Sequence, residues 1–446
     1  MSVDARRGLR FEYVGFDLEP AQNRVVCRYR LDDRDFREVI SFPGGGDWSQ
    51  PAVAAAARLL FLLTGVSYYK AGAPPVIDLG RTALTSTELR WLREYYLEGL
   101  GEFGYRNGLD LSDLKIEAPV LVREGPVGYQ PTDGRPLVPF GGGVDSIVSV
   151  ELIRKRVDDA ALFVVNRPGD RFAAIEEPAL VTGLPVVRAD REIDEQVLRS
   201  VELGFLNGHV PVTGIISAIA VLAAVLEGRD AVVMSNEWSA SQATLEVDGR
   251  MINHQYSKSE AFEAGFREVI AESIGERPDY FSLLRPMTEV WIAERFAELP
   301  QYFDHFRSCN RAFRIDPARR YDHWCGECDK CAFIDLVLAP YLDEPTLRRV
   351  FSQGGEPLAK PELTDMFRTL LALTPDAKPW ECVGDVAESR VAARMAAARP
   401  DRADNQILAV LVEEAEPFKD PSVAELTRPV GHHFVPERYA PDLLLA

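Results

Sequence analysis

One stretch restricts the possible folds of this chain more than any other. It is a short apolar run, Leu137 to Phe140, that ends in Gly141, Gly142 and Gly143 and is followed by Asp145-Ser146 and an amphipathic pattern. That order predicts a strand, a tight loop and the N-terminus of a helix. Glycine lets the backbone approach a bound anion closely, and a helix N-terminus adds partial positive charge. The stretch therefore predicts a phosphate site.

The order of residues in this loop differs from the Walker A pattern, because no Gly-Lys-Ser/Thr sequence closes it. It resembles the PP-loop of the ATP pyrophosphatases, Ser-Gly-Gly-x-Asp-Ser, with Gly141 in place of the first serine. The resemblance implies cleavage of ATP between its α- and β-phosphates. It implies that Asp145 helps to hold Mg²⁺, and that Ser146 and the amides of Gly142 and Gly143 hold pyrophosphate oxygens. A glycine turn without a ligand is the alternative, and the Asp-Ser pair argues against it.

Length and charge narrow the class of protein. The 446 residues, 46% hydrophobic and 27% charged, are typical of a soluble globular protein of two or three domains. The net charge of −19 argues against a nucleic-acid partner, which needs clustered Lys and Arg. No signal core follows the first arginines, and the longest apolar stretch, Ile215 to Leu226, is too short to span a bilayer. Six cysteines do not make a disulfide scaffold. We expect a cytoplasmic protein without a membrane segment.

Periodicity divides the chain into three regions. Residues 1–130 are predicted to form an N-terminal α+β region, residues 131–335 a PP-loop ATP-binding domain that includes a cysteine cluster, and residues 336–446 a helical region. The tail from Val430 is interrupted by proline and is predicted to be irregular. In the outer regions we expect strands at Leu9 to Phe16 and Arg24 to Leu31, and helices at Ala52 to Leu63, Leu84 to Gly99, Glu344 to Ser352, Glu362 to Leu373 and Val383 to Ala398.

The middle region alternates short apolar runs with helical segments, which predicts an α/β fold with a parallel sheet covered on both faces. The predicted strands are Pro136 to Phe140, Ala160 to Val165, Pro185 to Ala189 and Ala231 to Ser235. Ligands of such sheets bind beyond the carboxyl ends of the strands. The glycine loop, Asn166 and the run Ser235-Asn236-Glu237 fall at three such ends. We therefore expect them to converge on one crevice.

A second motif is a cluster of cysteines. Cys325, Cys328 and Cys331 are separated by two-residue gaps, and Cys309 lies 16 positions before the first of them. Tetrahedral zinc takes four thiolates, and Cys-x-x-Cys turns present them in pairs. We expect a zinc site, with an iron–sulfur cluster as the alternative for the same ligands. A PP-loop with this cluster is similar to the 7-cyano-7-deazaguanine synthase family, in which the zinc is structural, over about 200 central residues.

Two further polar stretches contain candidate catalytic residues. The first, residues 235–242, contains Glu237, and the second, residues 253–259, contains His254, Tyr256 and Lys258. These residue types serve as acid, base or phosphate ligand. Lys258 could equally clamp a phosphate of ATP. The alternative is a capped loop, with Ser257 or Ser259 as the N-cap of the helix that begins at Glu260. We interpret His209 and His305 as structural.

The glycine loop, both polar stretches, the cysteine cluster and the chain length together resemble the UDP-N-acetylmuramoyl-L-alanyl-L-glutamate epimerase family of peptidoglycan synthesis. The resemblance covers most of the chain. It implies an ATP-dependent enzyme that inverts the terminal L-Glu of UDP-MurNAc-L-Ala-L-Glu to D-Glu and releases AMP and pyrophosphate. The implied cofactors are ATP, Mg²⁺ and a structural Zn²⁺.

The residues fit such chemistry. An α-proton beside a carboxylate is very weakly acidic, because its removal places two negative charges side by side. Adenylation of the carboxylate removes one charge and makes the carbonyl a better electron sink. A base can then remove the proton and an acid can return it on the other face. A PP-loop ligase or amidase that adenylates another carboxylate is the alternative function. A nucleotide sensor is disfavoured, because it has less need of the Asp145 carboxylate.

Overall fold

One large sheet runs through the molecule. The computed structural model describes residues 7–247, 249–314, 316–374, 379–381 and 383–444. Its main strands are β1 (Phe11–Glu19), β2 (Arg24–Leu31), β3 (Arg34–Ser41), β4 (Val76–Asp78), β5 (Lys115–Glu117), β6 (Thr132–Pro139), β7 (Ala161–Asn166), β8 (Val186–Glu192), β9 (Arg229–Met234) and β12 (Asp279–Ser282). Within the described residues these ten strands form one sheet in the order β12-β9-β6-β7-β8-β3-β2-β1-β4-β5. A separate hairpin pairs β10 (Leu245–Val247) with β11 (Arg250–Ile252).

The half of the sheet that carries the glycine loop is parallel. The chain enters it at β6, continues to β7 and β8 on one side, and then crosses to β9 and β12 on the other side. The loops after β6 and β9 therefore diverge to opposite sides of the sheet. In doubly wound sheets this switch point opens a crevice at the carboxyl ends of the strands. The predicted glycine loop follows β6 at this place.

The other half of the sheet is mixed, because β4 pairs parallel with β1 and β5 pairs parallel with β4, and it is joined to the parallel half without a break. Strands β1, β2 and β3 pair antiparallel, and β3 pairs antiparallel with β8. At this junction the buried carboxylate of Glu38 accepts a hydrogen bond from Nε of Arg191 at 2.7 Å. The strands of the first and second predicted regions thus belong to one sheet.

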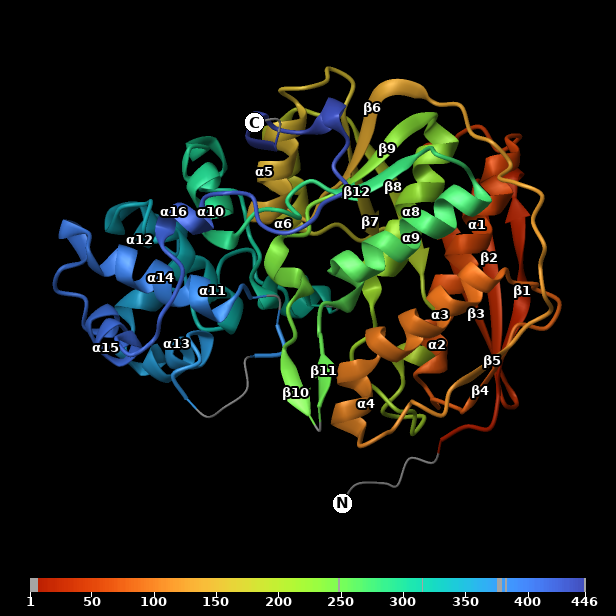
Figure 1. Cartoon of the computed structure of the whole chain (residues 1–446), viewed down its shortest axis with the longest axis horizontal. Coiled ribbons are helices and arrows are strands. Elements are labelled where there is room, and N and C mark those ends of the chain that lie inside the picture. Colours follow the sequence, from red (N-terminus) through yellow and green to blue (C-terminus); the bar gives the residue numbers. More distant parts are fainter. Residues whose placement is uncertain (1–6, 248, 315, 375–378, 382, 445–446) are drawn as a thin grey trace.

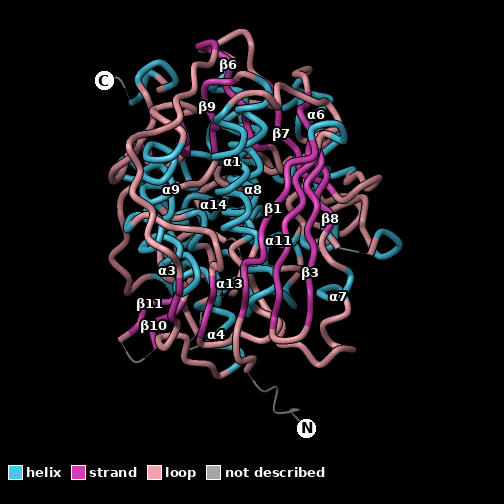
Figure 2. Tube along the Cα trace, turned by 90° about the vertical axis from the view of Figure 1, so that its right-hand side faces the viewer, coloured by secondary structure: helices cyan, strands magenta, loops and turns pink. Residues whose placement is uncertain are grey.

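Helices cover both faces of the sheet. The longer helices are α1 (Pro51–Thr64), α3 (Ser86–Gly99), α4 (Gly101–Asn107), α5 (Val144–Ile153), α6 (Ala173–Thr182), α8 (Val212–Glu227), α9 (Glu260–Ser273), α10 (Glu289–Ala297), α11 (Asp329–Leu338), α12 (Glu344–Val350), α13 (Thr364–Leu370), α14 (Val386–Ala397) and α15 (Gln406–Ala415), and the short ones are α2 (Val66–Tyr69), α7 (Glu195–Leu198) and α16 (Val423–Leu426). Figure 2 shows α1 and α8 side by side next to β1. Figure 1 shows α11 to α15 gathered on the side of the molecule opposite β1 to β5.

The side-chain alternation of the central strands separates two cores. Leu137 and Val232 face the core that contains α1, α8 and α9, whereas their neighbours Val138 and Val233 face the core that contains α5, α10 and α11. All four side chains are fully buried. A strand that is buried on both faces has a continuous run of apolar residues in its sequence. This run allowed β6 and β9 to be predicted as strands.

Local signals explain several helix boundaries. Thr85 caps α3, and Glu88 completes a capping box. Ser259 caps α9 by accepting a hydrogen bond from the amide of Phe262. The apolar stretch from Ile215 to Leu226, which is too short to span a bilayer, lies in α8 and is a buried core helix. The segment Pro51–Tyr69 is long and apolar enough to cross a membrane, but 83% of its most apolar 18-residue window is buried in the fold, as expected for a core helix.

Several elements were not predicted from the sequence, among them β3, β4, β5, β12, α4 and α15. Strand β3 was not predicted, because two pairs of adjacent charged residues interrupt its apolar positions and its charged core residue, Glu38, is matched by an arginine far away in the chain. Beyond Val430 the described residues form only short 3-10 turns, in agreement with an irregular tail.

Candidate active site

A cavity of about 370 Å³ opens at the switch point of the sheet. Its walls come from the carboxyl ends of β6, β7 and β9, from the starts of α5, α8, α10 and α11, and from the segment before Cys309. The predicted site residues in its walls are Gly141, Gly143, Asp145, Ser146 and Lys258. Three strand ends therefore meet at one cavity, as expected from the sequence. Gly142, Asn166, Glu237, His254 and Tyr256 do not line it.

The glycine loop requires glycine for two different reasons. Gly142 has φ +75°, and a Cβ atom there would lie 2.1 Å from the carbonyl oxygen of Ala174 in α6. A Cβ atom on Gly143 would lie 2.9 Å from Oγ of Ser308, whereas one on Gly141 would meet only open space. The loop is thus pressed between α6 and the segment before Cys309, while Gly141 faces the cavity.

The N-terminus of α5 points its amides toward this cavity. Gly143 is the N-cap residue and provides no side-chain cap, and Oγ of Ser146 donates a hydrogen bond to the carbonyl of Gly143 at 3.0 Å. The first amides of a helix have no partner within the helix, and the helix dipole makes the region partly positive. Such an end without a side-chain cap fits a phosphate-sized anion.

Carboxylates gather beside the loop. Asp145 lies in the first turn of α5, and Glu289 begins α10, which packs against α5. Burial, together with the negative charges of Asp145 and Glu237, raises the pKa of Glu289 well above its usual range. Lys330 of α11 lies near enough to oppose this effect. A group of carboxylates that repel one another at the edge of a cavity favours a bound cation.

Two buried polar side chains at the strand ends lack hydrogen-bond partners. Both polar atoms of Asn166, at the end of β7, and Oγ of Ser235, just after β9, are buried without a partner among the described residues. Asn166 is only 5% exposed, and Ser235 lines the cavity. Buried polar groups without partners are rare and costly. The position of Ser235 fits a polar ligand in the cavity.

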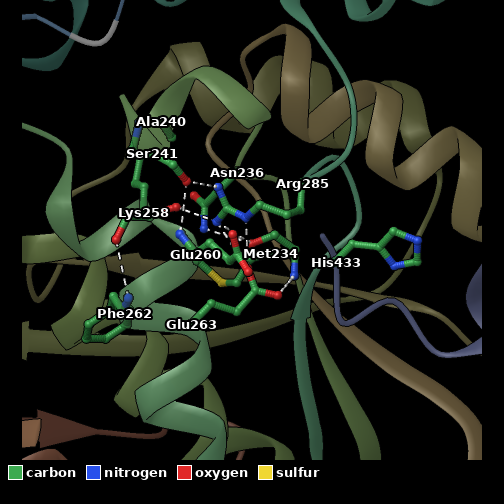
Figure 3. Close-up of polar contacts among 12 residues, drawn as sticks. Met234, Asn236, Ala240, Ser241, Lys258, Glu260, Phe262, Glu263, Arg285 and His433 are labelled. Atoms are coloured by element: carbon green, nitrogen blue, oxygen red, sulfur yellow. Dashed lines mark hydrogen bonds and ion pairs between the residues drawn. The ribbon is translucent and has the colours of Figure 1, made fainter. Parts of the chain in front are cut away.

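Arg285 ties together the two polar stretches that the sequence singles out (Figure 3). It is fully buried and forms an ion pair with Glu263 of α9 at 3.1 Å. It also donates to the carbonyl of Glu237 at 2.8 Å and to the carbonyl of Lys258. The first stretch continues into a 3-10 turn, Trp238–Ser241, and the second into Tyr256–Lys258. A single guanidinium group therefore fixes the backbone at two of the four candidate catalytic residues, Glu237 and Lys258.

The four candidate catalytic residues have different surroundings. Nζ of Lys258 donates to Oε1 of Gln255 at 3.1 Å and lies in the cavity wall. Tyr256 faces the aromatic core instead: its hydroxyl donates to Glu94 at 3.2 Å, and burial and that carboxylate raise its pKa well above the usual range. His254 pairs with Glu102 at 2.5 Å. Glu237 is buried close enough to Glu289 to influence its pKa.

The four cysteines come together as predicted from their spacing. The ligand atoms of Cys309, Cys325, Cys328 and Cys331 all lie within 4.8 Å of one another. Two of the Sγ···Sγ distances are 3.5 and 3.6 Å, close to the roughly 3.8 Å expected for tetrahedral coordination with bonds of about 2.3 Å. Gly326 has φ +65° and lies against Gly355, which explains the glycine after the first thiol of the turn. The cluster can hold a structural metal.

This cluster stands next to the cavity. Ser308 precedes Cys309, and Lys330 lies between Cys328 and Cys331, and both Ser308 and Lys330 line the cavity. The amide of Arg307 also reaches the carbonyl of Gly142 at 3.4 Å. A metal at the cysteines would therefore hold the wall of the cavity that faces the glycine loop.

Comparisons with known proteins identify the family. The model described as the MurL N-terminal domain matches residues 3–283, and the one described as the MurL C-terminal domain matches residues 305–425. The chain belongs to the MurL family. A MurL relative from Salinispora tropica, named UDP-N-acetyl-alpha-D-muramoyl-L-alanyl-L-glutamate epimerase, is 38% identical over 98% of this chain and 96% of its own length. A relative of the same name from Xanthomonas oryzae is 37% identical over 96% and 95%. No solved structure gives a significant match.

Several residues of this candidate site were not predicted from the sequence. Glu289, Lys330 and Arg307 line the cavity, and Arg285 stabilises its loops. Lys330 could have been predicted from the sequence as a candidate, because it lies inside the cysteine motif. The other three belong to no local motif and are brought to the site by the packing of α10 and of the segments beside it.

Proposed function

We propose that the protein is an ATP-dependent epimerase that converts the terminal L-Glu of UDP-MurNAc-L-Ala-L-Glu to D-Glu and releases AMP and pyrophosphate in the cytoplasm. The main support for this proposal is that the glycine loop and Asp145 line a cavity at the switch point of the sheet. Membership of the MurL family, whose curated relatives are named as this epimerase, supplies the substrate.

The residues around the cavity fit ATP and Mg²⁺. The amides at the start of α5, with Ser146, would hold phosphate oxygens, and Asp145 with Glu289 would hold the metal ion. The PP-loop assignment is supported by the position of the loop after the first strand of a doubly wound sheet. Bound ATP would supply the adenylyl group that neutralises the carboxylate of the terminal glutamate.

Activation of that carboxylate is the step that makes inversion accessible. Once its negative charge is removed, the carbonyl can accept the electron pair left by the departing α-proton. A base must then stand on one face of the α-carbon and an acid on the other. Hydrolysis of the activated ester returns the free carboxylate with D configuration, so that the substrate changes in stereochemistry but not in mass.

The first measurement is incubation of the purified protein with UDP-MurNAc-L-Ala-L-Glu, ATP and Mg²⁺. We expect D-Glu in the product together with an equivalent amount of AMP, determined by chiral analysis after acid hydrolysis and by chromatography. An unchanged product mass distinguishes this outcome from amidation, which shifts the mass by about one unit. AMP formation with an amide product, or with no D-Glu, would contradict the epimerase and favour a ligase.

We further propose that the cysteine cluster holds one structural Zn²⁺. We expect about one zinc per chain by elemental analysis, and its loss, together with lower thermal stability, in the Cys331→Ser variant, because structural zinc contributes folding free energy. The control is Cys27→Ala, which alters a buried cysteine outside the cluster and should keep the metal. A stable, active preparation without metal would contradict the proposal, and an iron–sulfur absorption band would identify the alternative.

A further inference from the structure

A second cavity lies at the opposite end of the parallel strands. Its volume is about 420 Å³, and its walls come from the glycine-rich turn after β3, the start of β8, the last turn of α8 and the first residue of β9. Helix α8 connects the two cavities: Thr213 and Ile216 near its start line the cavity at the glycine loop, whereas Leu226 and Glu227 at its end line the second one. A helix of 16 residues is about 24 Å long, so the two cavities are separate sites.

Arg229 brings a buried positive charge to the second cavity. Its side chain is only 5% exposed, and Nη1 donates to the carbonyl of Asp159 at 3.4 Å. Because Asp159 precedes β7, and β6 lies between β9 and β7, this side chain extends across the start of β6 toward β8 and the cavity. In the part of the chain that the structure describes, Nε has no hydrogen-bond partner, and the guanidinium group has one ion-pair partner, the carboxylate of Asp159 at the long distance of 3.9 Å.

That carboxylate does little to neutralise Arg229, because it is already engaged elsewhere. Asp159 accepts a hydrogen bond from Nε of Arg135 at 2.7 Å. Burial and the positive charge of Arg135 lower the pKa of Arg229. Buried charges in proteins normally have a close partner of opposite charge. An anionic group of a ligand in the second cavity would supply this partner.

Glu227 brings the opposite charge to another wall of the second cavity. Its Oε1 lies 3.8 Å from the position that a Cβ atom on Gly44 would take, and both residues line the cavity. Its negative charge acts on Arg229, whose pKa it raises, yet among the described residues Glu227 forms no ion pair with Arg229 or with another cation. The remaining charged residue of the walls, Arg188, donates two hydrogen bonds to Glu176, at 2.7 and 2.9 Å. The walls therefore present one cation and one anion that are not paired with each other.

The rest of the wall is largely apolar and firmly held. Phe42, Val187 and Leu226 contribute apolar side chains from three segments. The amide of Gly45 donates to the carbonyl of Phe42 at 2.9 Å, and the amide of Asp47 donates to the carbonyl of Leu226 at 2.9 Å. The glycine-rich turn is thus attached to the end of α8, and the cavity is formed before a ligand arrives. Cavities that are mainly apolar and carry a few well-placed polar groups are typical of small-molecule sites.

We propose that the second cavity binds a small zwitterionic amino acid with an apolar side chain. The carboxylate of this ligand pairs with Arg229, and its ammonium group pairs with Glu227. Its side chain lies against the apolar part of the wall. The site is separate from the candidate active site, so the proposal does not depend on the epimerase activity.

Two simpler interpretations make different predictions. A site for any small anion requires Arg229 but not Glu227, and such an anion would place a second negative charge near the Glu227 carboxylate, which is unfavourable. An arginine that serves only the fold requires no ligand. Its charge is then expected to be matched within the protein, whereas the contact with Asp159 is long and shared with Arg135.

Calorimetric titration of the protein with L-leucine, L-valine and L-phenylalanine tests the proposal. We expect saturable binding of one molecule per chain for at least one of them. The analogues of the best ligand that lack the ammonium or the carboxylate group, which for leucine are 4-methylpentanoate and 3-methylbutylamine, should bind at least about tenfold more weakly, because each loses a charge-assisted contact. Absence of binding by all three amino acids would overturn the proposal, and equal binding of the analogue without the ammonium group would reduce the site to one for anions.

Three variants locate the binding. Arg229→Met should weaken it by roughly 10- to 100-fold, and Glu227→Gln should weaken it to a similar extent without affecting the analogue that lacks the ammonium group. Gly44→Leu should block the cavity, because the backbone there is not in the left-handed region and a Cβ atom would meet only Glu227. The control is Arg295→Met, since Arg295 also has a buried Nε without a partner among the described residues but lies outside the cavity lining.

The melting temperature distinguishes a ligand-binding arginine from a structural one. We expect that of unliganded Arg229→Met not to fall, because the variant removes a poorly paired buried charge and Asp159 keeps its contact with Arg135. A lower melting temperature with unchanged binding would show that Arg229 serves the fold and would overturn the proposal. Undiminished binding by folded Gly44→Leu would also overturn it, because the amino acid would then bind elsewhere.

Discussion

Replacement of Asp145 by alanine is expected to abolish pyrophosphate release, with a loss of roughly 1,000-fold or more in turnover. The carboxylate stands in the first turn of α5, beside the glycine loop, and its charge contributes to the raised pKa of Glu289. If the proposed function holds, the cavity would lose a ligand for Mg²⁺ in this variant. A metal ion supplies several kcal/mol of charge stabilisation in phosphoryl chemistry, and each 1.4 kcal/mol or so corresponds to about tenfold in rate.

The measurement is pyrophosphate release with saturating UDP-MurNAc-L-Ala-L-Glu, ATP and Mg²⁺. Asp145→Asn, which keeps the size of the side chain and removes its charge, should be nearly as inactive as the alanine variant. The matched control is Glu176→Gln, an acidic residue in the first turn of the neighbouring helix α6 that pairs with Arg188 outside the cavity. Wild-type release from a folded Asp145→Ala protein would show that the loop does not bind the pyrophosphate.

Contiguous features of this molecule were predictable because all their determinants lie close together in the sequence. The strand, glycine loop and helix around Asp145 form one run of about twenty residues, and the structure has β6 and α5 on either side of the loop. The capping box of Thr85 and Glu88 is equally local. The cysteine cluster could be predicted from the spacing of its residues alone, because Cys-x-x-Cys turns have few conformations that bring thiols together.

Features that depend on distant partners were not predictable in the same way. Glu102 contacts His254, which lies more than 150 positions later in the sequence, so neither segment alone predicts the contact. His209 was interpreted as structural, because nothing near it in the sequence places a second imidazole against its ring. Tyr256 was a candidate by residue type, but its hydroxyl is directed to Glu94 on α3. Residue type and loop position cannot show which way a side chain faces.

The second large effect is expected from Arg285→Met. The substitution leaves Glu263, which is 1% exposed, as a buried charge without its partner, and it removes donors from the carbonyls of Glu237 and Lys258. Breaking a buried ion pair on one side costs about 3–5 kcal/mol of folding free energy. Because both polar stretches lose their common anchor, we also expect a loss of roughly 100-fold in epimerisation, the order that displacements of about 1 Å produce. Urea denaturation and the D-Glu assay measure the two effects.

The double variant Arg285→Met with Glu263→Gln separates stability from positioning. In the wild-type protein the amide of Ser282 donates to Glu263 at 2.9 Å. Glutamine at position 263 keeps an oxygen to accept this hydrogen bond and leaves no buried charge. Neutral replacement of a buried pair is often nearly free of cost, so the double variant should recover most of the lost stability. Its activity should stay low, because the carbonyls of Glu237 and Lys258 still lack the guanidinium donor. Activity that returns together with stability would show that Arg285 serves only the fold, and that the two loops reach their positions without it.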